Sequence, residues 1–489
     1  MQEIFSGNQV NILDEEYLLH SKLDSYLLME RAASAFVDWF LEQGFEKEFT
    51  LFVAIGSGNN GGDGLAIARL LNEHGYNLKL IRLFDSFSDL SKDAKTNFDL
   101  ISSRISIFDW NGFLFQTKGI LIDCFLGVGL KGDLRPSAKG KINFLNRFDG
   151  KIISVDMPSG LLADEYSTSV AVKASVTVTF QFPKLALLVP DNAENCGELV
   201  VLDIGITKGP NSKLFSEKYF LQKNDLSSLH KKFNRFSYKG DFGKCLIIGG
   251  SPGKMGALFL ACKSALRTGS GLVTCHLDES ERVIIQESLP EAMCTWGDLP
   301  ELDSFDSVAI GPGWGTDKRL TLFEKVLNSN NNPFVLDADA LNLLSQKPDL
   351  IKLLPKNSIL TPHIGEFKRL VGDSSNHFQR IEQAKDFAVD NGVILVLKGA
   401  NTLISLPDGR QVFNSSGTHY MATGGSGDVL TGMVVAFLGM GYLPENAALC
   451  AVYHHGLAGE IASINKRRGL IASDIIDKIP DTYLRLNIT

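Results

Sequence analysis

The sequence lacks any Cys-x-x-Cys pair, although it holds seven cysteines in 489 residues. Zinc sites and disulfide frameworks use closely or regularly spaced cysteines, so the scatter of these residues favours neither. We expect reduced thiols in the core instead. The cysteines are Cys124, Cys196, Cys245, Cys262, Cys275, Cys294 and Cys450.

Targeting and membrane signals are missing as well. Residues 1–9 show no basic segment followed by an apolar one, which a signal peptide would have. No apolar run reaches the length of a membrane span. These absences predict a cytoplasmic protein without a membrane partner.

Positive charge is also scarce. The 48 Lys and Arg residues are outnumbered by 56 Asp and Glu, which gives a net charge of -8. This balance argues against nucleic acid as the main partner, whereas small anionic metabolites stay possible because their sites are built locally. The 44% hydrophobic and 21% charged composition is typical of a soluble globular protein, and the length predicts two domains.

A glycine-rich stretch, Gly56-Ser-Gly-Asn-Asn-Gly-Gly-Asp-Gly64, follows a predicted strand over 50–55 and precedes a helical segment over 65–73. It contains Gly-x-Gly-x-x-Gly in the strand-to-helix context that cradles a pyrophosphate. Asp85, after the next predicted strand, lies near the distance expected of a ribose-binding acid. An NAD-dependent dehydrogenase is therefore one alternative.

Oxygen-bearing side chains count against a simple phosphate turn. They crowd the glycine-rich stretch and recur where later strands end, and such oxygens suit a hard cation. Because the carboxyl ends of parallel strands share one edge of a sheet, we expect several of them to converge, although the aspartates could instead only cap the turns that follow. The residues are Asn59, Asn60, Asp63, Asp123, Asp156 and Ser159.

Four motifs resemble the NAD(P)H-hydrate epimerase family over residues 1–215. They are Gly-Asn-Asn-Gly-Gly-Asp-Gly at 58–64, Asp-x-x-x-Gly-x-Gly-Leu-Lys-Gly-Asp at 123–133, Val-Asp-Met-Pro-Ser-Gly at 155–160 and Val-Thr-Val-Thr-Phe-x-x-Pro-Lys at 176–184. The sequence departs mildly from the family at Phe125-Leu-Gly-Val-Gly129 and at Met157. The resemblance implies a Rossmann-like three-layer α/β fold.

The same resemblance implies roles for individual residues. Asn60, Asp123 and Ser159 would bind a potassium ion, and Asp156 would be the catalytic acid/base. The hydrated nicotinamide cofactor would contact Asn59, Asn60, Gly61, Gly62, Asp63, Gly127, Val128, Gly129, Leu130, Lys131, Gly132, Asp133 and Asp156.

The second half alternates strand-like and helical runs. Strands are predicted over 245–248, 308–310, 334–336, 359–361 and 393–397. This alternation predicts a mostly parallel sheet with helices on both faces. A polar stretch between the halves places the boundary near residue 225, which predicts domains 1–225 and 226–489.

The stretch Ala422-Thr-Gly-Gly-Ser-Gly-Asp-Val-Leu-Thr-Gly432 precedes an apolar helical run. Gly425, Ser426 and Gly427 are therefore expected at a helix N-terminus, where unpaired N–H groups and the helix dipole attract phosphate. Asp428 beside such a site would accept a proton from an attacking hydroxyl, or would only complement the dipole.

Other loops at strand ends are rich in small residues. The segment 249–254 is similar to a P-loop, but its glycine spacing is short and Met255 stands where a magnesium-binding Ser or Thr should be, so we reject that interpretation. His363 could contact substrate or be a buried structural histidine. The pair His454-His455 is interpreted as structural.

These loops and the Gly-x-Gly-Asp turn resemble the ADP- or ATP-dependent NAD(P)H-hydrate dehydratase family, which has a ribokinase-like fold, over residues 226–489. The resemblance implies a hydrate site at Ala257, Gly313, His363 and Asp428. It implies nucleotide binding by Lys398, Gly399, Ala400, Asn401, Thr402 and Gly427, with Mg²⁺ on the phosphates.

Together the two resemblances imply a bifunctional enzyme that repairs hydrated NADH and NADPH. It would interconvert the R and S forms at C6 and dehydrate the S form with ADP, or with ATP. The alternatives are a small-molecule kinase fused to a Rossmann-like regulatory domain, the dehydrogenase, and a binding scaffold without turnover. We also expect a homo-oligomer.

Overall fold

The computed structural model describes residues 1–115, 119–329 and 332–488. The chain forms two compact units. The N-terminal unit is Glu3–Ser216, and the C-terminal unit is Glu217–Thr489 together with Met1–Gln2. The expected boundary near residue 225 therefore falls inside the C-terminal unit, because the short apolar strand β9 (Lys218–Leu221) joins that unit's sheet.

The N-terminal unit is built on a seven-stranded sheet of order β4-β3-β2-β5-β6-β7-β8, in which every pairing is parallel. Its strands are β2 (Thr50–Ile55), β3 (Asn77–Arg82), β4 (Ser106–Asp109), β5 (Gly119–Cys124), β6 (Lys151–Val155), β7 (Val176–Phe180) and β8 (Glu198–Leu202). Its helices are α1 (Gly7–Ser21), α2 (Ser25–Glu42), α3 (Asn59–Glu73), α4 (Lys92–Ile101), α5 (Pro136–Leu145) and α6 (Ala193–Cys196).

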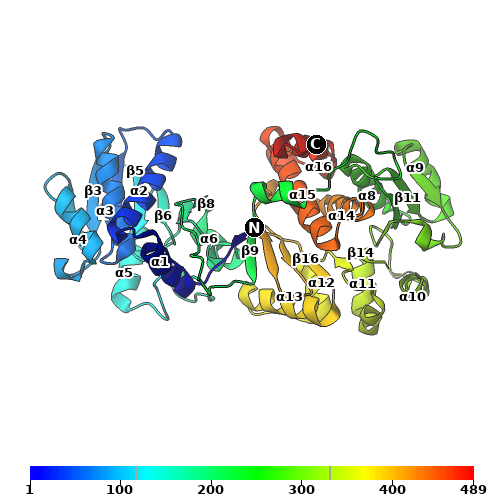
Figure 1. Ribbon diagram of the computed structural model, residues 1–489, viewed down its shortest axis with the longest axis horizontal. Coiled ribbons are helices and arrows are strands. Elements are labelled where there is room, and N and C mark those ends of the chain that lie inside the picture. Colours follow the sequence, from blue (N-terminus) through cyan, green and yellow to red (C-terminus); the bar gives the residue numbers. More distant parts are fainter. Residues whose placement is uncertain (116–118, 330–331, 489) are drawn as a thin grey trace. The chain divides into compact units, whose positions relative to one another are not determined.

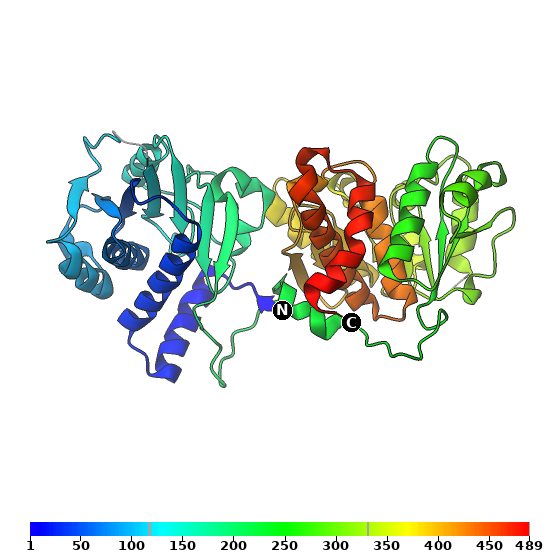
Figure 2. The same cartoon turned by 90° about the horizontal axis from the view of Figure 1, so that it is seen from above.

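Alternating side chains of β2 serve the two faces of this sheet. Leu51, Val53 and Ile55 pack in one cluster with α1, α2 and α3, whereas Phe52 and Ala54 pack in another with α5. This is the period of two expected for a strand that is buried on both sides. Figure 2 shows the dark-blue helices α1 and α2 on one side of these strands. The unit therefore has three layers.

Helix α3 begins at Asn59, inside the glycine-rich stretch, and not near residue 65 as its apolar pattern suggests. Glycine permits this early start because the helix packs closely on the turn and on β5. A Cβ on Gly61 would lie 2.0 Å from the carbonyl oxygen of Gly56, and one on Gly64 would lie 2.6 Å from the Cβ of Cys124. Packing overrides the low helix propensity of Asn and Gly here.

The C-terminal unit has a sheet of order β1-β9-β18-β17-β16-β15-β14-β13-β10-β11-β12. Strand β17 runs antiparallel to both of its neighbours, and the other pairings among strands β9 to β18 are parallel. Besides β9, the strands are β1 (Gln2–Glu3), β10 (Lys244–Ile248), β11 (Leu272–His276), β12 (Met293–Thr295), β13 (Ser307–Ile310), β14 (Phe334–Leu336), β15 (Ile359–Leu360), β16 (Ile394–Leu397), β17 (Leu403–Ser405) and β18 (Gln411–Asn414).

Helices cover both faces of this sheet as well, with α8, α14, α15 and α16 on one side and α11, α12 and α13 on the other (Figure 1). Within the described ranges, every helix is too short or too polar to span a bilayer. The helices are α7 (Leu226–Leu229), α8 (Met255–Thr268), α9 (Arg282–Ser288), α10 (Leu320–Asn328), α11 (Asp339–Gln346), α12 (Ile364–Val371), α13 (His377–Asn391), α14 (Ser426–Gly439), α15 (Pro444–Lys466) and α16 (Ala472–Leu486).

Each sheet contains a point where the strand order reverses. In the N-terminal unit β2 lies between β3 and β5, and in the C-terminal unit β10 lies between β11 and β13. Chain connections leave such a point in opposite directions, which opens a crevice at the carboxyl ends of the strands. The glycine-rich loops after β2, β5, β10 and β13 all lie at these two positions.

Candidate active sites

A cavity of about 990 Å³ lies in the N-terminal unit, among the loops after β2 and β5. Residues that the sequence predicts as substrate contacts line much of it: Asn59, Asn60, Asp63, Gly127, Val128, Gly129, Leu130, Lys131, Asp133 and Asp156. Gly61, Gly62 and Gly132 are not among its walls. Gly61 and Gly62 are buried by packing, since a Cβ on Gly62 would lie 2.5 Å from Met29 Cε.

Asn60, Asp123 and Ser159 come together beside the carbonyl oxygen of Leu126. Asn60 Nδ2 donates to this oxygen over 3.0 Å, and Ser159 Oγ lies 3.2 Å from it. Ser159 also donates from Oγ to Asp123 Oδ1 over 2.6 Å. Burial raises the pKa of Asp123. The hydrogen bonds that it accepts from Ser159, Ser154 and Phe125 lower this pKa, but only partly offset the effect of burial. The fold thus brings these three side chains together at one edge of the sheet, and their role as ligands of an ion stays a prediction.

Asp156 adopts a left-handed backbone conformation with φ of 65°. Such a conformation is uncommon for a residue with a side chain, although Asp and Asn adopt it more readily than most, and it is enriched at functional sites. The carboxylate accepts a hydrogen bond from Lys184 Nζ at 2.5 Å and one from Thr179 Oγ1 at 3.1 Å. The Lys184 side chain is 1% exposed, so this ion pair is enclosed by protein on the lysine side.

Lys184 and Asp14 are ionisable residues at this cavity that have no role in the sequence-based prediction. Lys184 is part of a motif but carries no assignment there, and Asp14 projects from α1 and also lines the cavity. Burial raises the pKa of Asp14 to about 6, with Lys184 lowering it and Asp156 raising it. Burial also raises the pKa of Asp63 well above its ordinary value. A single aspartate within a helix gives no sequence signal for such a position.

In the C-terminal unit, α14 begins at Ser426 with Gly425 as its N-cap, in the left-handed conformation at φ of 87°. The predicted helix N-terminus is therefore confirmed. Asp428 lies in the first turn, where burial raises its pKa to about 7, helped by Asp337 and opposed by Lys398. A carboxylate with this pKa can accept a proton near neutral pH.

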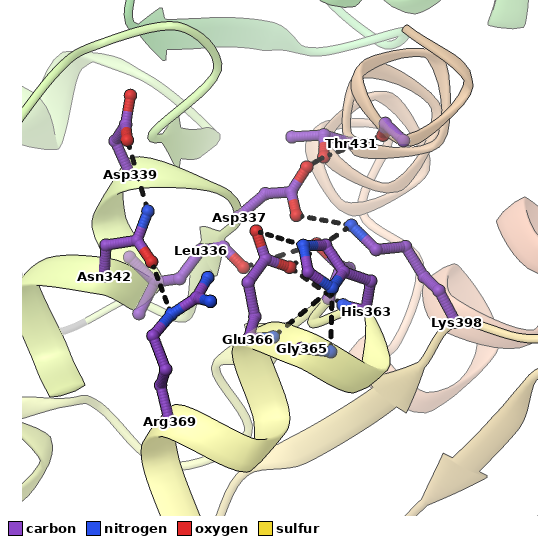
Figure 3. Close-up of polar contacts among 12 residues, drawn as sticks. Leu336, Asp337, Asp339, Asn342, His363, Gly365, Glu366, Arg369, Lys398 and Thr431 are labelled. Carbon is purple, nitrogen blue, oxygen red and sulfur yellow. Dashed lines mark hydrogen bonds and ion pairs between the residues drawn. The ribbon is translucent and has the colours of Figure 1, made fainter. Parts of the chain in front are cut away.

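A buried charge network surrounds the α14 N-terminus (Figure 3). Lys398 Nζ donates to Asp337 Oδ1 over 2.8 Å and lies 3.8 Å from Glu366 Oε2. Thr431 Oγ1 donates to Asp337 Oδ2 over 2.7 Å. Burial alone would lower the pKa of Lys398, but Asp337 and Glu366 hold it above its usual value. The sequence shows Asp337 and Glu366 at strand ends without revealing that they share one lysine.

His363 caps helix α12. Its Nδ1 accepts hydrogen bonds from the backbone N–H groups of Gly365 at 2.9 Å and Glu366 at 3.3 Å. The side chain is 55% exposed, so His363 is not a buried histidine. Its contact with substrate stays a prediction.

The other predicted residues of this unit fall into two neighbouring groups. A Cβ on Gly313 would lie 3.1 Å from Ala257 Cβ and 2.4 Å from the Lys254 carbonyl oxygen, so these residues meet at the loops after β10 and β13. A Cβ on Gly427 would lie 3.2 Å from Lys398 Nζ. The turn containing Gly399, Ala400, Asn401 and Thr402 follows Lys398 directly, and Thr402 Oγ1 donates to the Gly399 carbonyl oxygen over 3.1 Å.

Comparison with known proteins matches both halves. Residues 25–186 match the family described as YjeF-related protein N-terminus, and residues 245–481 match NAD(P)H-hydrate dehydratase. The bifunctional NAD(P)H-hydrate repair enzyme of Moorella thermoacetica is 33% identical, over 97% of this chain and 94% of its own. The chain belongs to the family of bifunctional NAD(P)H-hydrate repair enzymes. The family and the two folds expected from sequence are confirmed.

A second member of the bifunctional repair family and two solved structures are also similar to this chain. The Coxiella burnetii enzyme is 33% identical, over 97% of this chain and 98% of its own. The ADP/ATP-dependent NAD(P)H-hydrate dehydratase of Bacillus subtilis, co-crystallised with ATP and Mg²⁺, is 31% identical with a TM-score of 0.50, covering 55% of this chain and 98% of that one. A ribokinase-like superfamily protein from Enterococcus faecalis is 25% identical with a TM-score of 0.51, covering 57% of this chain and 100% of that one.

Proposed function

We propose that the C-terminal unit dehydrates the S form of hydrated NAD(P)H, using ADP as phosphoryl donor and Asp428 as general base. The position of Asp428 carries this proposal. It lies in the first turn of α14, beside the Lys398 ammonium, where a helix N-terminus attracts phosphate. The other predicted contacts to the hydrate and the nucleotide are part of the same proposal.

The chemistry follows from the poor leaving ability of hydroxide. Asp428 takes the proton of the C6 hydroxyl as that oxygen attacks the terminal phosphorus of the nucleotide. The resulting phosphate ester is expelled by the lone pair of the ring nitrogen, and loss of a proton from C5 restores the reduced nicotinamide. Mg²⁺ enters this proposal only on the nucleotide phosphates.

The direct test is to mix hydrated NADPH, ADP and Mg²⁺ with the protein. We expect the absorbance of reduced nicotinamide to return, and ATP in place of ADP shows which donor is preferred. A stable phosphorylated product without recovery of NADPH would indicate a small-molecule kinase instead.

For the N-terminal unit we propose interconversion of the R and S forms at C6, with Asp156 as acid/base. Support comes from the cavity, whose volume of about 990 Å³ suits a small-molecule ligand, and from the strained backbone of Asp156 at its wall. A dehydratase that acts on one form needs such a partner activity, because hydration creates both.

Potassium is the ion that we propose for Asn60, Asp123 and Ser159. The residues fit a hard cation, because all three offer oxygen and because the buried Asn60 Oδ1 has no hydrogen-bond partner among the described residues. Such an ion would neutralise the buried Asp123 carboxylate and hold the loop of Leu126 that borders the cavity.

Potassium should therefore raise the melting temperature of the N-terminal unit, whereas Asp123→Ala should remove this effect, because a ligand that binds only the folded state stabilises it. Calorimetry of the full chain in KCl and in tetramethylammonium chloride of equal ionic strength measures the difference. An equal response of wild type and variant would exclude this site, and so would an anomalous-scattering map without an ion between these residues.

The two activities should be separable, since each unit has its own core and, apart from the two-residue edge strand β1, its own continuous stretch of chain for its sheet. A chain ending at Ser216 should interconvert the two forms without nucleotide, and a chain from Glu217 should dehydrate the S form. Circular dichroism checks the folding of each part. Folded but inactive fragments would show that the sites are shared.

We also propose a cytoplasmic location and a homo-oligomer. Light scattering on the purified chain and fractionation of cells that express it test these two points.

A further inference from the structure

Inversion at C6 imposes a geometric demand on the epimerase. If the C6 oxygen leaves from one face of the ring and water returns to the other, protons must be handled on both faces. The departing oxygen needs an acid, and the incoming water needs a base. One carboxyl group fixed on one side of the ring serves only one of these two transfers.

The cavity of the N-terminal unit offers carboxyl groups on separate elements. Asp156 follows β6 at the sheet edge, while Asp14 belongs to α1, a helix that packs over one face of the sheet. Both line the same cavity, and the charge of Asp156 helps to raise the pKa of Asp14. Lys184 forms an ion pair with Asp156 at 2.5 Å, and its positive charge lowers the pKa of Asp14.

The other carboxyl groups at the cavity are less suited to exchange protons. Burial raises the pKa of Asp63, in the first turns of α3, well above its ordinary value, which disfavours its ionised form. Asp93 lies in the first turn of α4, where it complements the helix dipole. The remaining carboxyl groups are exposed to solvent: Glu15, Asp85, Asp89 and Asp133. Asp14 is intermediate, since it is partly buried and Lys184 partly offsets the loss of water around it.

We propose that Asp14 is a second catalytic acid/base of the epimerase and serves the ring face opposite to Asp156. This inference rests on the epimerase function proposed above. In one direction, the Asp14 carboxyl gives its proton to the C6 oxygen, the C6–O bond breaks and water leaves, while the nitrogen lone pair forms the N1–C6 double bond.

Water then adds to C6 from the other face. Asp156 takes a proton from this water, and the nitrogen recovers its lone pair. The enzyme ends with Asp156 protonated and Asp14 ionised, which is the protonation state needed for the opposite epimer. No oxidant or further reactant is required.

The test combines inversion with oxygen exchange in water labelled with heavy oxygen, using each purified epimer of hydrated NADPH and the full chain. Asp14→Asn should slow inversion about 100-fold or more. The epimer whose hydroxyl faces Asp156 should still exchange its oxygen with retention, because Asp156 alone can release water and take it back on its own face. Asp156→Asn should show the same pattern with the other epimer.

Controls separate this idea from the proposed function. Asp38→Asn makes the same change on the exposed side of α2 and should leave both rates unchanged. Asp14→Glu keeps the carboxyl and should invert faster than Asp14→Asn. The calorimetric transition of the N-terminal unit reports that each variant is folded, and nucleotide-dependent dehydration of the S form reports the same for the C-terminal unit. Wild type that does not invert above the uncatalysed rate refutes the epimerase function itself.

Two results would overturn the role of Asp14 while leaving the epimerase in place. One is inversion by Asp14→Asn within a few-fold of Asp38→Asn. The other is a parallel loss of inversion and exchange for both epimers, which means that Asp14 only supports the cavity.

Discussion

Asp428→Asn should lower dehydration by about 100-fold to 10,000-fold, the usual range for loss of a general base, while epimerisation continues. Asparagine is nearly isosteric and stays compatible with the first turn of α14, but it cannot accept a proton usefully near neutral pH. Removing a negative charge beside the proposed phosphate site should not weaken nucleotide binding. Nucleotide-dependent recovery of NADPH and chromatographic separation of the epimers measure the two activities in one sample.

The pH dependence gives a second measure of the same role. Burial raises the pKa of Asp428 to about 7, so the base form is present above that pH and is lost below it. For wild type, kcat/KM of dehydration should therefore fall about tenfold per pH unit below this pKa. Near-normal dehydration by Asp428→Asn would show that the residue only complements the helix dipole, and another base would be needed.

Lys398→Met should have the largest effect on stability. Asp337 is 2% exposed, and its Oδ1 would lose its cationic partner. Removing one partner of a buried ion pair costs about 3–5 kcal/mol, which corresponds to a melting-temperature decrease on the order of 10 °C in a domain of this size. Calorimetry of the full chain measures the transition of the C-terminal unit.

Two further variants test whether the unpaired charge of Asp337 causes this loss of stability. Lys478→Met removes the lysine of an exposed pair with Asp481, 2.8 Å apart, and should cost at most about 1 kcal/mol. Asp337→Asn added to Lys398→Met should recover part of the loss, since the unpaired charge is then gone. Equal melting temperatures for Lys398→Met and Lys478→Met would show that the buried pair of Lys398 and Asp337 contributes no more to stability than an exposed pair.

Sequence patterns predict the parts of this fold that short-range chemistry controls. The apolar run of β2 and the glycines before α14 each have a local signal, and the structure has both elements where they are expected. The edge rule for parallel sheets also brings Asn60, Asp123 and Ser159 together without knowledge of any contact.

What the sequence does not reveal depends on tertiary packing. Helix α3 starts early because Gly61 tolerates the carbonyl of Gly56, which no propensity scale registers. The division between Ser216 and Glu217 has no local signal, because β9 is only four residues long and lies in a polar stretch. Asp14 and Lys184 gain their chemistry from a cavity formed by distant segments, so neither residue carries a local sign of it.

The left-handed backbone conformation of Asp156 determines which substitutions at this position report on the carboxylate alone. At φ of 65°, asparagine is among the few residues that occupy this region readily, whereas alanine is disfavoured by about 1–2 kcal/mol. Asp156→Ala would thus change two things at once, the carboxylate and the shape of the loop that leads to Ser159. A saturation screen at this position would rank residues partly by backbone tolerance, so Asp156→Asn is the variant whose rate loss reports on proton transfer.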